Sequence, residues 1–149
     1  MRITRHEEFE VAHLLPGYNG GCGRLHGHTY KIEVTVQGDQ KEQFDMVADF
    51  KIVKQAIKDV VPDHYFVYYK EDEISKKIAD VLRSYNIDCI EYPFYTTAEN
   101  MVTYYANTIE DILRNTYGLD VCIAEVKLWE TTNSYATWKK EDYENVRKK

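Results

Sequence analysis

A segment near the start of the chain, residues 28–37, alternates between two kinds of side chain, and this alternation restricts how the chain can fold. Its even-numbered side chains from Tyr30 onward are apolar, and its odd-numbered side chains are polar or charged. A period of two indicates a strand with one buried face. Extended backwards, the buried face includes His28 and then His26. The sequence therefore predicts two imidazoles on one face at the start of a strand.

A second alternating segment, residues 3–13, places a third histidine in a similar position. Val11 and His13 share its apolar face. If the two strands are neighbours, three imidazoles converge, and imidazole is a usual ligand of zinc. The predicted metal ligands are therefore His13, His26 and His28. The alternative is that these are polar residues at strand ends, hydrogen-bonded to the backbone.

Cys22 lies at the end of a glycine-rich loop, residues 14–21, four residues before His26. As a metal ligand, its thiolate would complete a closed zinc shell. As a free thiolate beside a cation, it would have a lowered pKa and act as a base or nucleophile. Three histidines alone leave one coordination position open, as catalytic zinc sites do. Cys89 and Cys122 lie in apolar surroundings and are predicted to be core residues.

Two other groups of polar side chains are candidates for chemistry. Asp63 and His64 follow a helix that ends at Pro62. They are either a turn aspartate and a surface histidine, or a relay in which the carboxylate orients the imidazole for proton transfer. Glu130 continues the buried phase of a strand over 121–130, and it either forms a salt bridge or binds the N–H and amino groups of a planar ring. The apolar residues of that phase are Cys122, Ala124, Val126 and Leu128.

The remaining periodicities predict an α+β domain. Helical spacing follows the cap residue Asp49, and a capping box at 96–99 is expected to begin a later helix. Further elements are expected at 74–85 (helix), 87–94 (short strand) and 134–138 (strand), and the helix that begins at the capping box is expected to stop at Gly118. Strand pairs at both ends of the chain predict an antiparallel β-sheet with helices packed on one face. Exposed sheet edges favour a homo-oligomer, and the length fits a single domain, 1–149.

The composition excludes several classes of protein. The net charge of −6 argues against a nucleic-acid partner, because such proteins usually carry a basic surface. No apolar run is long enough for a membrane span or a signal peptide, so no membrane association is expected. Three widely spaced cysteines do not suggest a disulfide framework, and this fits a reducing cytoplasm.

Short motifs stand in a fixed order along nearly the whole chain. They are Phe9–His13, Cys22–His28, Val47–Phe50, Asp63–His64, Thr97–Asn100 and Trp129–Thr131. This set resembles the 6-pyruvoyl-tetrahydropterin synthase / 6-carboxy-tetrahydropterin synthase family, and Cys22–His28 with an upstream histidine is its most specific part. The resemblance implies the tunnelling fold (T-fold) and homo-oligomers, commonly hexamers, with active sites between subunits. Residues 65–95 depart from the family's pattern and include an extra helical segment.

The resemblance also implies a role for each candidate residue. The implied zinc ligands are His13, His26 and His28. The implied catalytic residues are Cys22 as the proton-abstracting base, His64 and Asp63 as its relay, and Glu130. The implied substrate-binding residues are Glu130, which would bind the pterin ring, and Thr131.

The implied substrate is 7,8-dihydroneopterin triphosphate, which is made from GTP. The compact, single-cysteine form of Cys22–His28 resembles the 6-carboxy branch. That branch forms 6-carboxy-5,6,7,8-tetrahydropterin, releases acetaldehyde and triphosphate, and feeds 7-deazaguanine (queuosine) synthesis. One alternative is a 6-pyruvoyl-tetrahydropterin synthase, which eliminates triphosphate and keeps the carbons. Another is a non-catalytic, zinc-stabilised oligomer that binds a pterin or purine, with Cys22 in the metal shell.

Overall fold

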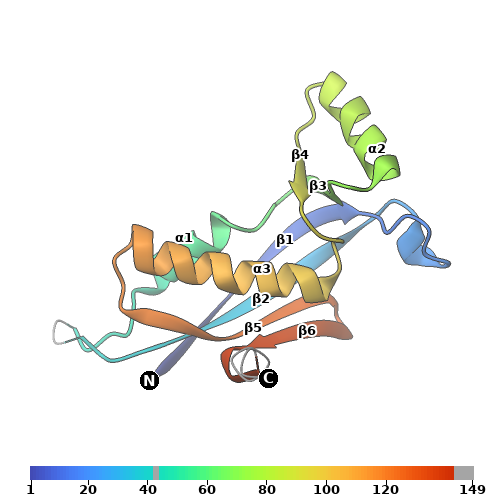
Figure 1. Cartoon of the computed structure of the whole chain (residues 1–149). Helices are drawn as coiled ribbons and strands as arrows, with labels where there is room; N and C mark the ends of the chain where they lie inside the picture. The colour runs from blue at the N-terminus through green and yellow to red at the C-terminus, as the bar shows by residue number, and fades with distance from the viewer. Residues whose placement is uncertain (42–43, 143–149) are drawn as a thin grey trace.

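The computed structural model describes residues 1–41 and 44–142, which form a six-stranded sheet with α1 and α3 packed on one face (Figure 1). The strands are β1 (Arg2–His13), β2 (His26–Gly38), β3 (Tyr65–Tyr69), β4 (Cys89–Tyr92), β5 (Val121–Thr131) and β6 (Ser134–Lys139). The helices are α1 (Phe50–Lys58), α2 (Glu73–Ser84) and α3 (Ala98–Asp111), with short helical turns at Gly21–Gly23 and Ile112–Thr116. Within the two described ranges, no helix is long and apolar enough to cross a membrane.

The strands lie in the order β4-β3-β1-β2-β5-β6. The pairs β1–β2, β2–β5 and β5–β6 are antiparallel, as the sequence predicts. The pairs β1–β3 and β3–β4 are parallel, so the complete sheet is mixed. β3 was not predicted because its central residues, Phe66–Tyr68, are all buried and therefore show no alternation.

The pairing of β1 with β2 determines where the histidines lie. His13 is opposite His26, and Val11 is opposite His28. Paired residues in a sheet point to the same face, and residues two apart on one strand share a face. The prediction that the two histidine-bearing strands are neighbours is therefore confirmed, and the three imidazoles lie at one end of the same face.

Two helices cover this inner face, and both begin at identifiable caps. The Asp49 side chain accepts a hydrogen bond from the Lys51 amide (2.8 Å) at the start of α1, as predicted. α3 begins one residue later than predicted, because the Thr97 hydroxyl, and not that of Thr96, caps the helix. Glu99 is therefore the second helical residue and not the third residue of a capping box.

The first half of β5 has a different inner face from the predicted one because of a β-bulge. The register between β2 and β5 shifts between Thr35 and Val36. As a result Ile123 is buried, whereas Cys122 and Ala124, predicted to be inward-facing, are only partly buried. Beyond the bulge the predicted phase holds, because Val126 and Leu128 are fully buried and Glu130 follows them. The prediction that Cys122 and Cys89 are core residues is wrong, since both are half-buried.

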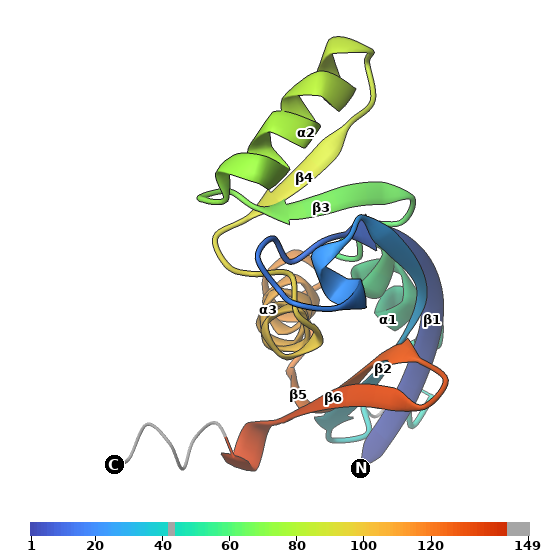
Figure 2. The same cartoon turned by 90° about the vertical axis from the view of Figure 1, so that its right-hand side faces the viewer.

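β3, α2 and β4 project from the rest of the fold (Figure 2). The helix predicted over 74–85 and the short strand predicted within 87–94 are both present. This arm has a small core of its own, which consists of Leu14, Phe66, Tyr68 and Ala79. The Tyr68 hydroxyl donates to Glu91 Oε2 (3.0 Å) and accepts from Arg83 Nη1 (3.0 Å), which joins β3, α2 and β4.

Candidate metal centre and active site

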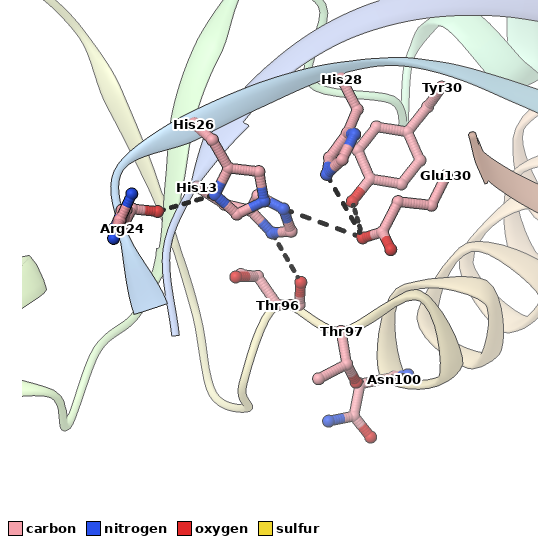
Figure 3. Close-up of polar contacts among 9 residues, drawn as sticks. All are labelled: His13, Arg24, His26, His28, Tyr30, Thr96, Thr97, Asn100 and Glu130. Carbon is pink, nitrogen blue, oxygen red and sulfur yellow. Dashed lines mark hydrogen bonds and ion pairs between the residues drawn. The ribbon is translucent and has the colours of Figure 1, made fainter. Parts of the chain in front are cut away.

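The histidines of β1 and β2 form one compact cluster (Figure 3). Each of His13, His26 and His28 offers a ring nitrogen, and these three nitrogens lie within 4.8 Å of one another. The His13 ring is almost completely buried, and the other two are partly exposed. The arrangement can hold a metal ion with three imidazole ligands.

Backbone carbonyls orient two of these rings. His13 Nδ1 donates to the Thr96 carbonyl (2.9 Å), and His26 Nδ1 donates to the Arg24 carbonyl (2.7 Å). A carbonyl oxygen only accepts, so the proton is on Nδ1 and the Nε2 lone pair is free. Partners of this kind are typical of metal-binding histidines, because they fix the tautomer and the ring orientation.

The unpaired nitrogens of the cluster fit a cation. Nε2 of His13 and Nε2 of His28 are buried and have no hydrogen-bond partner among the described residues. Burial lowers the pKa of His13 and of His28 below the usual value, and the neighbouring His26 acts in the same direction. Both rings are therefore favoured in the neutral form that binds a metal.

Glu130 lies beside the cluster at the end of β5. Its Oε1 is 3.8 Å from His13 Nε2 and 3.8 Å from His28 Nε2. The same oxygen accepts a hydrogen bond from the Tyr30 hydroxyl (2.8 Å; Figure 3). Burial raises the pKa of Tyr30 far above its usual value, and the Glu130 charge raises it further, so the hydroxyl remains a donor.

A hollow of about 250 Å³ opens between these side chains and the start of α3. It is lined by His13 and Glu130, and by Cys22 from the turn between β1 and β2. The other residues around it include Leu15, Tyr18, Thr97, Glu99, Ser134 and Tyr135. A thiol, a carboxylate and a histidine of the cluster thus line one hollow.

Cys22 lines this hollow but is not part of the histidine cluster. Among the described residues, the only group of ligand atoms close enough to hold a metal comprises the three histidine nitrogens. Cys22 is half-buried in the turn Gly21–Gly23, and its carbonyl accepts a hydrogen bond from the Leu15 amide (2.7 Å). This placement favours the role of a free thiol over that of a metal ligand.

Asp63 and His64 form a pair, but it lies in a different place. Asp63 Oδ1 and His64 Nδ1 are 2.9 Å apart, and both side chains are largely exposed. The Glu10 amide donates to Asp63 Oδ1 (2.9 Å), and the His64 amide donates to the Glu10 carbonyl (2.7 Å). His64 has a φ of 65°, which is unusual for a residue other than glycine.

The hollow beside His64 is separate from the one that Cys22 lines. It is lined by Glu10, Ala12, Gly27 and Thr29, which belong to the outer face of the sheet, and also by Val11 and His28 of the inner face. His64 and Cys22 thus line different hollows of one chain. Thr131, predicted to bind substrate, is also outside the Cys22 hollow, and its hydroxyl accepts from the Asn133 amide (3.2 Å) in the turn after β5.

Four residues around the cluster were not singled out from the sequence. Tyr30 was assigned only to the apolar face of its strand, and Glu99 only to a cap. Tyr18 and Tyr135 lie in a loop and on an edge strand, where no periodic signal marks them. The capping-box prediction placed Glu99 third in the helix. With Thr97 as the cap, Glu99 is second, and a capping box no longer accounts for it.

Comparisons with known proteins agree with the resemblance. The model of the 6-pyruvoyl tetrahydropterin synthase family matches residues 2–141. The 6-carboxy-5,6,7,8-tetrahydropterin synthase of Haemophilus influenzae is 34% identical over 143 residues, which is 92% of this chain and 97% of that protein. The enzyme of the same name from Aquifex aeolicus is 35% identical over 124 residues, which is 80% of this chain and 76% of that protein.

Solved structures share the fold. An uncharacterised protein from Wolinella succinogenes superposes with a TM-score of 0.74 at 19% identity, covering 94% of this chain and 98% of the other. The 6-pyruvoyl tetrahydropterin synthase of Caenorhabditis elegans superposes with a TM-score of 0.65 at 22% identity, covering 93% and 94%. At these identities the likeness establishes the architecture.

Proposed function

This chain belongs to the 6-pyruvoyl tetrahydropterin synthase family, and we propose that it is a zinc-dependent 6-carboxy-5,6,7,8-tetrahydropterin synthase. The substrate would be 7,8-dihydroneopterin triphosphate. With one water, it would give 6-carboxy-5,6,7,8-tetrahydropterin, acetaldehyde and triphosphate, as a step of 7-deazaguanine (queuosine) synthesis. The observation that carries the proposal is the pair of unpartnered Nε2 atoms, on His13 and His28, beside a hollow that also holds Cys22 and Glu130.

The residues of the hollow have separate roles in this proposal. Zinc on His13, His26 and His28 would polarise the hydroxyl groups of the substrate side chain and acidify them. Cys22 would remove a proton from the side chain of the substrate, because a thiolate beside a cation is stabilised. Glu130 would accept hydrogen bonds from the N–H and amino groups of the pterin ring.

We also propose that a second copy of the chain completes the site. Asp63 Oδ1 and His64 Nδ1 are 2.9 Å apart, and His64 lines a hollow that does not include Cys22, so the pair would not act on Cys22 of its own chain. β1 pairs with β3 only at Val11 and Ala12, which leaves most of that edge of β1 open to another strand. A homo-oligomer, such as the hexamer that the family resemblance implies, would bring the pair of one subunit to the hollow of another.

The product assay tests the main proposal. Purified, zinc-loaded protein is incubated with 7,8-dihydroneopterin triphosphate, the pterins are separated by chromatography, and acetaldehyde is measured with a coupled alcohol dehydrogenase. We expect 6-carboxy-5,6,7,8-tetrahydropterin and acetaldehyde in equal amounts. Triphosphate release without acetaldehyde would instead identify the 6-pyruvoyl reaction. Binding of a pterin with no turnover would identify the non-catalytic alternative and contradict the proposal.

Gly23→Ala should displace the turn that carries Cys22. An added Cβ at Gly23 would overlap the carbonyl oxygen of Tyr18, whereas a Cβ at Gly21 would meet nothing within 4 Å. Since a shift of about 1 Å in a reacting group can cost about 100-fold in rate, we expect kcat/KM to fall by about that factor in Gly23→Ala. The matched Gly21→Ala variant should stay close to wild type. Equal kcat/KM values for the two variants would show that the position of this turn does not matter.

A further inference from the structure

Tyr30 is a core residue that lies between the histidine cluster and Phe9. Its side chain is fully buried, and its ring stacks on Phe9 with centroids 5.5 Å apart. Its other side faces the rings of His28 (5.5 Å) and His13 (6.1 Å) edge-on. The ring is therefore held by packing, and the hydroxyl has one fixed direction, toward Glu130 Oε1 at 2.8 Å (Figure 3).

Glu130 Oε1 lies near the distance at which it would itself become a metal ligand. In a tetrahedral zinc site the ligand atoms lie about 2.0–2.2 Å from the ion and therefore roughly 3.3 Å from one another. Oε1 is 3.8 Å from both His13 Nε2 and His28 Nε2, so it lies only slightly outside that spacing. A small movement of this carboxylate would close the open position of a three-histidine site.

We infer that Tyr30 is a positioning residue that keeps Glu130 off the metal. Its hydroxyl holds Oε1 at the edge of the cluster, and this leaves the carboxylate directed toward the hollow. The inference rests on the proposed function, because an open coordination position and a free carboxylate matter only if a substrate uses both. Tyr30 of β2 thus has a role in orienting Glu130 in addition to its role in packing.

Tyr30→Phe tests the inference without relying on turnover. Loss of the hydroxyl frees Oε1 to bind the metal, so the dissociation constant for Zn²⁺ should fall about tenfold, the effect of one hydrogen bond to a charged group. In Co²⁺-loaded protein, the exchange of the ligand in the open position for a carboxylate should shift the visible absorption bands. In the enzyme assay, KM should rise about tenfold with a smaller change in kcat, because Glu130 no longer serves the pterin ring.

Two further variants make the test specific. Tyr105→Phe removes an equally buried hydroxyl from the same aromatic core, where Tyr105 also contacts Phe9 (6.1 Å), and it should leave the Co²⁺ spectrum unchanged. In a Glu130→Ala background, Tyr30→Phe should have no further effect on the spectrum or on Zn²⁺ affinity. The inference is overturned if Tyr30→Phe changes neither the Co²⁺ spectrum nor the Zn²⁺ affinity. It is also overturned if Tyr30→Phe changes them to the same extent in the Glu130→Ala background. If the Co²⁺ spectra and Zn²⁺ affinities change as expected but the wild-type protein makes no product, only the proposed function is contradicted.

Discussion

Replacing Cys22 by alanine should leave zinc bound and lower turnover severely. The metal should remain because its three nitrogen ligands form a group of their own, to which the Cys22 sulfur does not belong among the described residues. Turnover should fall by a factor of about 10²–10⁴, the usual contribution of a positioned general base. The measurements are zinc content by atomic emission after gel filtration and kcat from the product assay.

Cys122→Ala is the matched control for this experiment. Cys122 is a half-buried thiol on β5, and it does not line the hollow beside His13. Its loss should change neither zinc content nor kcat. If Cys22→Ala instead releases the zinc, Cys22 is a ligand, the metal shell is closed, and the non-catalytic alternative gains support.

Mixed oligomers of two inactive variants should regain activity. Cys22→Ala and His64→Ala each remove one group of the proposed proton relay, so each homo-oligomer should be inactive. If the site takes Cys22 from one subunit and the Asp63–His64 pair from another, random mixing restores both groups in about a quarter of the sites, one half times one half. The two variants are refolded together, or co-expressed with different affinity tags, and kcat is compared with that of wild type.

The control for this experiment mixes Cys22→Ala with Glu130→Ala, a variant that removes a residue contributed by the same subunit as Cys22. Cys22 and Glu130 line the same hollow of one chain, so a mixed site still lacks one of them in every copy. This mixture should stay inactive. No recovery with His64→Ala would show that the Asp63–His64 pair does not act on the hollow of a neighbouring subunit. Recovery in the control would show that Cys22 and Glu130 act from different subunits.

The sequence was sufficient to predict the histidine cluster, because period-2 alternation is a property of each strand alone. The apolar faces that include His13 and His28 required only that the two strands be neighbours, and β1 and β2 are consecutive strands, joined by residues 14–25. The helix caps at Asp49 and Thr97 are local hydrogen bonds, so they were predicted to within one residue.

The remaining features depend on contacts that are distant in sequence. The bulge opposite Thr35 depends on how β5 fits against β2, and it moved Cys122 out of the predicted face. β3 is buried on both sides by the arm and the body of the fold, which removes the alternation that would mark it as a strand. The Asp63–His64 pair was recognisable in the sequence, but the face of the sheet that it occupies is fixed by the Glu10 backbone.

The hydrogen bond from His13 to the Thr96 carbonyl joins the histidine cluster to the start of α3. Thr96 is buried directly before the cap of α3, and the next residues, Thr97 and Glu99, form a wall of the hollow. An ion on His13 would therefore stiffen the wall that the proposed substrate contacts, and a bound substrate would hold the carbonyl that orients His13. Affinity for the ion and affinity for the substrate would then be linked by one reciprocal free energy, so each ligand would strengthen the binding of the other.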